Sequence, residues 1–179
     1  MLFSNVSHSR LNMTNTTRRT FLHTIGATTV FGTATGVATA SKSPGTPVSG
    51  SGEGTITNLE VFPIREVGGN TFEDRVLQGT ATGTLEGSFE QRVSGMVHES
   101  GRVVFRGTMT FTGRVADCGE GTITLGVSGR GHVPEPGFPI TEASVRVINQ
   151  PANTVDVTGT GIVSQEGPQL TYSIRYVCR

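Results

Sequence analysis

The residues best suited to acid–base or metal chemistry beyond position 40 are two histidines, His98 and His132. The run His98-Glu99-Ser100 contains a base, an acid and a hydroxyl, but a catalytic triad needs partners brought together from separate parts of a fold. We therefore interpret this run as a solvated turn. His132 opens a proline-stiffened loop containing Glu135, and one His with one Glu supplies too few ligands for a metal ion. The sequence predicts no catalytic residue, no metal and no cofactor.

The two cysteines, Cys118 and Cys178, offer a different chemistry. An even count in an exported chain favours one disulfide between them. Two free thiols or half of a metal site are the alternatives, although neither cysteine has the short C-x-x-C spacing that is typical of zinc sites. A Cys118–Cys178 bond would tie the last segment of the chain to a turn in its middle.

The beginning of the chain carries the most specific motif. Thr17-Arg18-Arg19-Thr20-Phe21-Leu22-His23 is followed by a weakly apolar run and by the small residues Val37-Ala38-Thr39-Ala40. This arrangement resembles the twin-arginine export signal, with cleavage expected after Ala40. The resemblance implies that the twin-arginine translocase and a signal peptidase are partners, that the chain is exported folded, and that its location is secreted or extracytoplasmic. Because Met13 also precedes a complete signal, translation could start there.

Composition limits the other partners. The chain has 14 Lys+Arg and 14 Asp+Glu, but residues 1–40 hold basic side chains and no acid, so the remainder is mildly acidic. A mildly acidic body is a poor match for nucleic acid. The apolar run of the leader is shorter and richer in Thr than the roughly 20 apolar residues of a membrane span, so no span is expected in the mature chain.

The body has the period-two pattern of half-buried strands. In residues 103–113, Val103, Phe105, Met109 and Phe111 share one face, and Thr and Arg occupy the other. The pattern predicts about eight strands, near residues 54–62, 75–85, 89–98, 103–113, 122–128, 141–148, 155–163 and 170–176. The expected domains are a signal peptide at 1–40, a flexible Ser/Gly/Pro linker at 41–53 and a β-domain at 54–179.

Eight antiparallel strands can close into a barrel or divide into a β-sandwich, and frequent glycines on the inward face favour the barrel. The runs Gly79-Thr80-Ala81-Thr82-Gly83-Thr84, 105–113 and 118–122 resemble the secreted small β-barrels of the calycin-like (lipocalin-like) and allene-oxide-cyclase-like type. The resemblance implies an all-β, eight-stranded antiparallel barrel and no particular activity.

Three functions follow as hypotheses. The first is a binding module with a small apolar ligand in the interior, and the second is a cell-envelope or extracellular interaction module. The third is a barrel-type isomerase or cyclase, which would need an inward acid, whereas the polar side chains expected inside are Gln91, Tyr172, Tyr176 and Asn58. We therefore do not expect an enzyme. The side chains expected to line the interior are Phe105, Met109, Phe111, Val127, Tyr172 and Tyr176.

Overall fold

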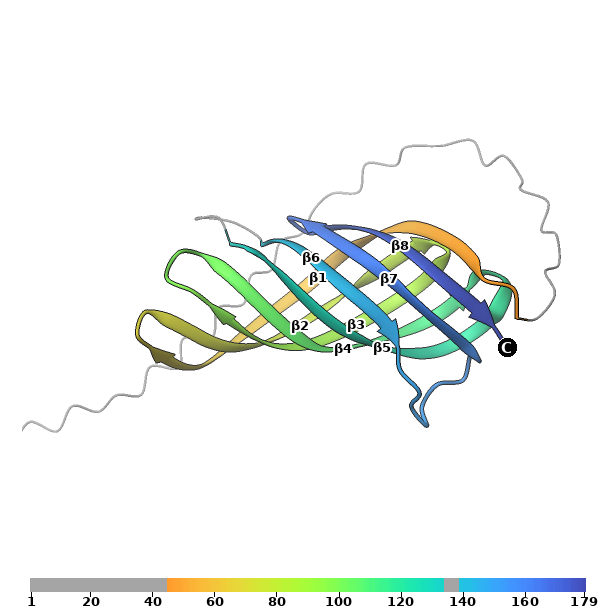
Figure 1. Ribbon diagram of the computed structural model, residues 1–179, viewed down its shortest axis with the longest axis horizontal. Coiled ribbons are helices and arrows are strands. Elements are labelled where there is room, and N and C mark those ends of the chain that lie inside the picture. The colour runs from red at the N-terminus through yellow and green to blue at the C-terminus, as the bar shows by residue number, and fades with distance from the viewer. Residues whose placement is uncertain (1–44, 134–138) are drawn as a thin grey trace, which may run out of the picture.

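The computed structural model describes residues 45–133 and 139–179, in which eight antiparallel strands close into a barrel (Figure 1). Each strand pairs with its neighbours in sequence, and β8 pairs with β1 to complete the ring. This confirms the all-β barrel and excludes the sandwich. The export motif and its cleavage site lie outside the described residues. The strands are β1 (Val48–Val67), β2 (Asn70–Gly83), β3 (Leu85–Val97), β4 (Arg102–Val115), β5 (Gly119–His132), β6 (Ile140–Val147), β7 (Val157–Glu166) and β8 (Gln169–Cys178), and the 3₁₀ turn η1 (Ala116–Cys118) joins β4 to β5.

The pairing around the barrel is strongly staggered. Gly52 on β1 is opposite a residue of β8, which in turn is opposite a residue of β7, and so on around the barrel. This series of paired residues passes through β2 and returns to β1 at Pro63 rather than at Gly52. A closed sheet needs such a stagger because its strands tilt against the barrel axis. Alternate side chains then face the interior. The inward positions predicted for Phe111 on β4, Val127 on β5 and Tyr176 on β8 are confirmed, because all three are buried in the core.

β1 begins at Val48, earlier than the start expected at Gly54, so part of the expected linker is barrel wall. Its first half pairs with β8 as far as Thr55. Residues 49–54 show no alternation of apolar and polar side chains, because glycines occupy the inward positions. Side chains and backbone of the neighbouring strands fill the space beside these glycines. A Cβ added to Gly52 would overlap the ring of Tyr172.

The chain reverses at Thr84, inside the run 75–85 that was expected to form one strand. β2 ends at Gly83, whose φ of 98° suits only glycine, and β3 begins at Leu85. The amide of Thr84 donates to the Ser51 carbonyl oxygen at 3.1 Å, and its Oγ1 accepts from the Ser51 amide at 3.0 Å. Alternation of small and apolar residues continues through this turn, so the pattern does not reveal the reversal.

Inward glycines lie where neighbouring strands approach closely. Gly107 on β4 is an example: an added Cβ would overlap the carbonyl oxygen of Arg92 and lie 2.7 Å from the Cα of Val93. Both contacts are backbone atoms, so they can move only if the β3–β4 pairing opens. The interior of the curved sheet therefore excludes even a methyl group at this position.

We expect Gly107→Ala to lower the free energy of unfolding by about 1–3 kcal/mol, which is the usual cost of overpacking. Gly126→Ala is the matched control, because an added Cβ on that outward glycine meets no atom closer than 3.4 Å. Urea denaturation followed by circular dichroism compares the two variants. Equal stabilities would contradict the steric explanation.

The β1–β2 and β3–β4 hairpins project beyond the rest of the barrel at one end (Figure 1). β1 pairs with β8 only as far as Thr55, so its second half has one free edge among the described residues. Bulges follow Ile56 and Pro63 in its pairing with β2, and Pro63 has no N–H to offer. These features blunt an edge that could otherwise pair with another chain. Exposed hydrophobic side chains on this hairpin are Phe62, Ile64 and Val67.

Candidate functional site

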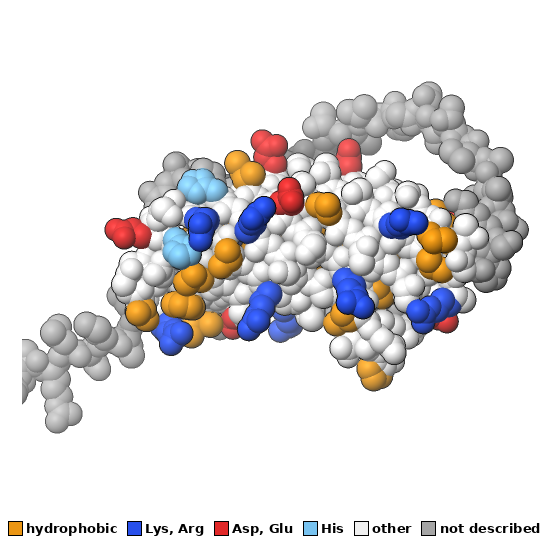
Figure 2. Space-filling view, viewed as in Figure 1, with side chains coloured by type: hydrophobic (Ala, Val, Ile, Leu, Met, Phe, Trp, Pro, Cys, Tyr) orange, Lys and Arg blue, Asp and Glu red, His pale blue; other side chains and the backbone are white. Residues whose placement is uncertain are grey.

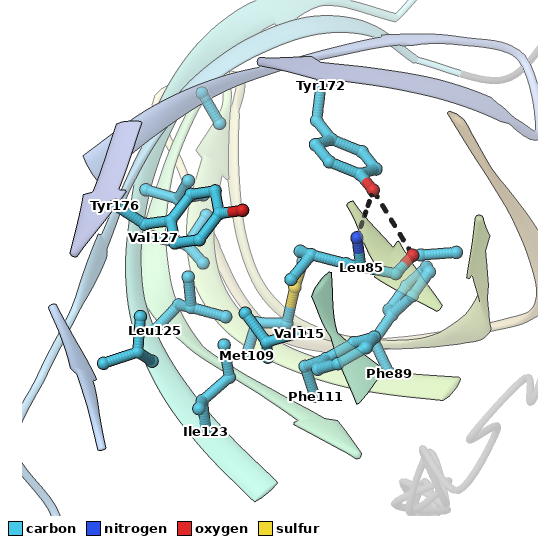
Figure 3. Close-up of a cluster of buried hydrophobic side chains, with 14 of the residues drawn as sticks. Leu85, Phe89, Met109, Phe111, Val115, Ile123, Leu125, Val127, Tyr172 and Tyr176 are labelled. Carbon is cyan, nitrogen blue, oxygen red and sulfur yellow. Dashed lines mark hydrogen bonds between the residues drawn. The ribbon is translucent and has the colours of Figure 1, made fainter. Parts of the chain in front are cut away.

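The six side chains predicted to line the interior come together inside the barrel. Five are buried members of one hydrophobic cluster, and the partly buried Phe105 packs against it. Figure 3 shows members of this cluster from β3, β4, β5 and β8 facing one another across the interior. The six are Phe105, Met109, Phe111, Val127, Tyr172 and Tyr176.

The interior formed by the described residues is packed rather than hollow. All eight strands contribute buried apolar side chains to the cluster. Two interior cavities measure about 20 Å³ each, whereas a water molecule needs roughly 10–15 Å³ and a small-molecule pocket occupies about 300 Å³ or more. In this conformation the six side chains act as core, and an apolar ligand would have to displace some of them.

The two tyrosines carry polar atoms in this core. Tyr172 Oη accepts a hydrogen bond from the Leu85 amide at 2.8 Å (Figure 3) and donates one to the Thr82 carbonyl oxygen at 2.8 Å. Burial raises the pKa of Tyr172, and the bond from Leu85 opposes this rise. Burial also raises the pKa of Tyr176, and the carboxylate of Asp117 adds to the effect. Both phenols therefore stay neutral near pH 7, and Tyr172 fastens β8 to the β2–β3 turn.

A buried ion pair on β2 faces the interior and is absent from the sequence prediction. Glu73 is 7% exposed, and its Oε1 accepts a hydrogen bond from the guanidinium of Arg75. Both residues share a face with Leu77, so extension of the period-two pattern would have placed them inside. The expected strand began only at Arg75, and charged side chains seldom face a core. The inward acid that an isomerase needs is thus present, but Arg75 already pairs with it.

Other polar side chains follow the prediction in part. Gln91 faces inward and lines one of the small cavities together with Gln165 and Thr141, whose Oγ1 donates to Gln165 Oε1 at 3.3 Å. Asn58 was expected inside, but a bulge after Ile56 turns it outward, where its Nδ2 donates to Gln78 Oε1 at 3.4 Å. The prediction for Asn58 was wrong because a pattern of alternation cannot locate a bulge.

The two histidines lie in the β3–β4 connection and at the end of β5. The amide of His98 donates to the carbonyl oxygen of Arg102 at 2.8 Å and closes the turn. His132 is exposed, and Glu135 lies outside the described residues. Within residues 45–133 and 139–179, no group of three or more His, Cys, Asp or Glu side chains could hold a metal ion.

Cys118 and Cys178 form the predicted disulfide. Their Cα atoms are 5.1 Å apart, and the bond joins η1 to the end of β8. It therefore links the last strand to the connection between β4 and β5, at the end of the barrel opposite the projecting hairpins (Figure 1). The sequence alone was also compatible with two free thiols. The fold removes that alternative, because it brings the two cysteines together in a disulfide.

The outer face of the barrel has an open groove of about 790 Å³ that crosses β3 to β7, here called the outer groove. Guanidinium groups of Arg106 on β4 and Arg146 on β6 line it. No described residue that lines it is acidic. The hollow forms because small residues surround the two long arginines. These are the hydroxyl residues Ser94, Thr108, Ser128, Ser144 and Thr160, together with Gly126, which has no side chain.

Charge is unevenly distributed around the barrel. Acidic side chains outnumber basic ones on β1 to β3, and the reverse holds on β4 to β8. Figure 2, which views the molecule from the side of β5 to β8, shows Arg side chains (blue) spread along this face. The acidic residues of β1 to β3 are Glu53, Glu60, Glu66, Glu73, Asp74, Glu86 and Glu90. The basic residues of β4 to β8 are Arg102, Arg106, Arg114, Arg130, Arg146 and Arg175.

Several of these charges are already paired. Arg92 pairs with Glu90 at 2.8 Å, and Arg114 pairs with Glu86 at 3.0 Å. Hydrogen bonds from Gln78 and then Arg92 hold the pKa of Glu90 below its ordinary value. In contrast, the arginines of the outer groove form no ion pair with any residue in the described ranges. The groove thus presents positive charge that is available to a partner.

The chain matches no protein-family model, and no curated protein shows significant similarity to it. No helix in the described part of the chain is long and apolar enough to cross a membrane.

Proposed function

We propose that this chain is an exported, extracytoplasmic interaction module that binds its partner on the outer wall of the barrel. One contrast between the described parts of the barrel carries the proposal: two cavities in the interior measure about 20 Å³ each, whereas an arginine-lined groove on the outer face measures about 790 Å³. A ligand site needs space and polar groups that lack a partner, and both occur together on the outside.

Export is supported by the leader and by the disulfide. Residues 17–23 resemble a twin-arginine signal, and the small residues before position 41 suit a signal peptidase. A structural disulfide such as Cys118–Cys178 persists outside the reducing cytoplasm. Because β1 begins at Val48, cleavage after Ala40 would leave a short tail before the barrel.

Native mass spectrometry of the protein recovered from the extracytoplasmic fraction tests this proposal. We expect a mass that corresponds to residues 41–179 with one disulfide and no added small molecule. A co-purifying apolar compound would overturn the outer-wall assignment and favour an interior ligand at Phe105 and its neighbours. Recovery of only uncleaved chain from the cytoplasm would overturn export. A variant that replaces Arg18 and Arg19 with lysine is the control for the export route.

A further inference from the structure

Three arginines on the outer wall lie on every second strand, β4, β6 and β8. Arg146 on β6 is opposite Thr160 on β7, which is opposite Arg175 on β8. Neighbouring strands are about 4.8 Å apart, so these two arginines start roughly 10 Å from each other. On the other side, Arg106 on β4 is opposite Ser128 on β5. Ser128 is two residues from Gly126, and Gly126 is opposite Arg146 on β6. Arg106, Arg146 and Arg175 thus follow one direction around the barrel.

The chemistry between these arginines is neutral and rich in hydroxyls. Thr108, Ser128, Ser144 and Thr160 line the outer groove and can each donate and accept hydrogen bonds. Guanidinium groups bind carboxylate or sulfate with two parallel hydrogen bonds. A fitting occupant would therefore be an extended polymer that carries spaced anionic groups and hydroxyls between them.

Side chains that anchor other polymers are missing from the described lining. Protein partners are usually held by aromatic or large apolar anchors in pockets, and single-stranded nucleic acid is usually held by stacking on aromatic rings. No aromatic residue of the described ranges lines the outer groove, and its larger aliphatic side chains are Ile148 and Ile162. Ile162 is 50% exposed.

We propose that the outer groove binds an acidic polysaccharide, with Arg106 and Arg146 contacting its carboxylate or sulfate groups and the hydroxyl residues contacting the sugars. The inference rests on the proposed function, since it names the partner of that outer-wall surface. An acidic polysaccharide with a charged group on every second sugar presents charge at intervals that match arginines two strands apart. The neutral floor suits the sugars between the charges.

Isothermal titration calorimetry of the disulfide-intact mature protein with hyaluronate, which carries a carboxylate on every second sugar, tests the inference at low ionic strength. We expect binding that weakens as salt is added, since exposed charges are screened. Arg106→Gln and Arg146→Gln should each weaken binding about tenfold, the value of one charge-assisted hydrogen-bonded contact. Arg114→Gln is the matched control, because this exposed arginine already pairs with Glu86 and does not line the groove. It should leave the affinity unchanged.

Neutral dextran and poly-L-glutamate separate the classes of partner. Dextran should not bind, and polyglutamate should bind at least tenfold more weakly than hyaluronate. Equal affinity for polyglutamate, an equal loss in Arg114→Gln, or no binding to hyaluronate would each overturn the inference. If native mass spectrometry detects no added small molecule, any of these outcomes would overturn only the polysaccharide inference and not the proposed outer-wall function. A co-purifying apolar compound would overturn both proposals.

Discussion

Replacement of both cysteines, in the variant Cys118→Ala/Cys178→Ala, is expected to lower the free energy of unfolding by about 4 kcal/mol. The two residues are 60 positions apart. In the chain-entropy account, a bond that closes a loop of this length removes about 4 kcal/mol of conformational freedom from the unfolded chain. Equilibrium urea denaturation of the oxidised protein and the double variant measures the difference.

The reduced wild-type protein is the matched control for this prediction. With a reducing agent present, its denaturation midpoint should move to that of the double variant, which itself should not respond. Circular dichroism of the reduced protein should retain the strand signal, since all eight strand pairings close the barrel without the bond. An unchanged midpoint after complete reduction would contradict a stabilising role for the disulfide.

Arg75→Met is expected to lower the free energy of unfolding by about 3–5 kcal/mol, the cost of leaving a buried carboxylate without its partner. Glu73 is 7% exposed and accepts its hydrogen bond from this guanidinium. Methionine retains much of the length of the arginine side chain, so the loss reports mainly on charge. Chemical denaturation of the purified variant measures it.

A second variant separates the ion pair from packing. Glu73→Gln/Arg75→Met removes both charges and should recover most of the lost stability, because no uncompensated ion remains inside. The control is Arg92→Met, since Arg92 forms an exposed ion pair with Glu90 and its side chain is 70% accessible. It should have little measurable effect. Similar losses in Arg75→Met and Arg92→Met would contradict the burial of the Glu73–Arg75 pair.

Much of the barrel could be predicted from alternation. The inward faces of Phe111, Leu125 and Tyr172 follow directly from period two, because successive side chains of a strand point to opposite sides. The boundaries were harder to predict. Glycine at inward positions hides the first part of β1, where Tyr172 from β8 fills the space that a hydrophobic side chain of β1 would otherwise occupy.

The site was harder to predict than the fold. Alternation in residues 103–113 correctly predicted that Arg106 faces outward, but nothing in the spacing of Arg106 and Arg146 along the chain indicates that they line one groove. They meet because β4 and β6 lie on either side of β5 in a staggered register. Glu73 was missed for a related reason, since a charged residue inside a barrel is plausible only when its partner on the same strand is seen to share its face.

The all-β class, the approximate number of strands, the faces of the regular strands and the candidate pairing of Cys118 with Cys178 could be predicted from the amino-acid sequence. These are local properties, because each depends on side-chain alternation or on the count of a residue type. Closure of the ring, the packed interior and the position of Arg106 and Arg146 along one groove became known only from the three-dimensional fold. Closure, packing and cross-strand neighbours depend on register between distant segments, which no local pattern contains.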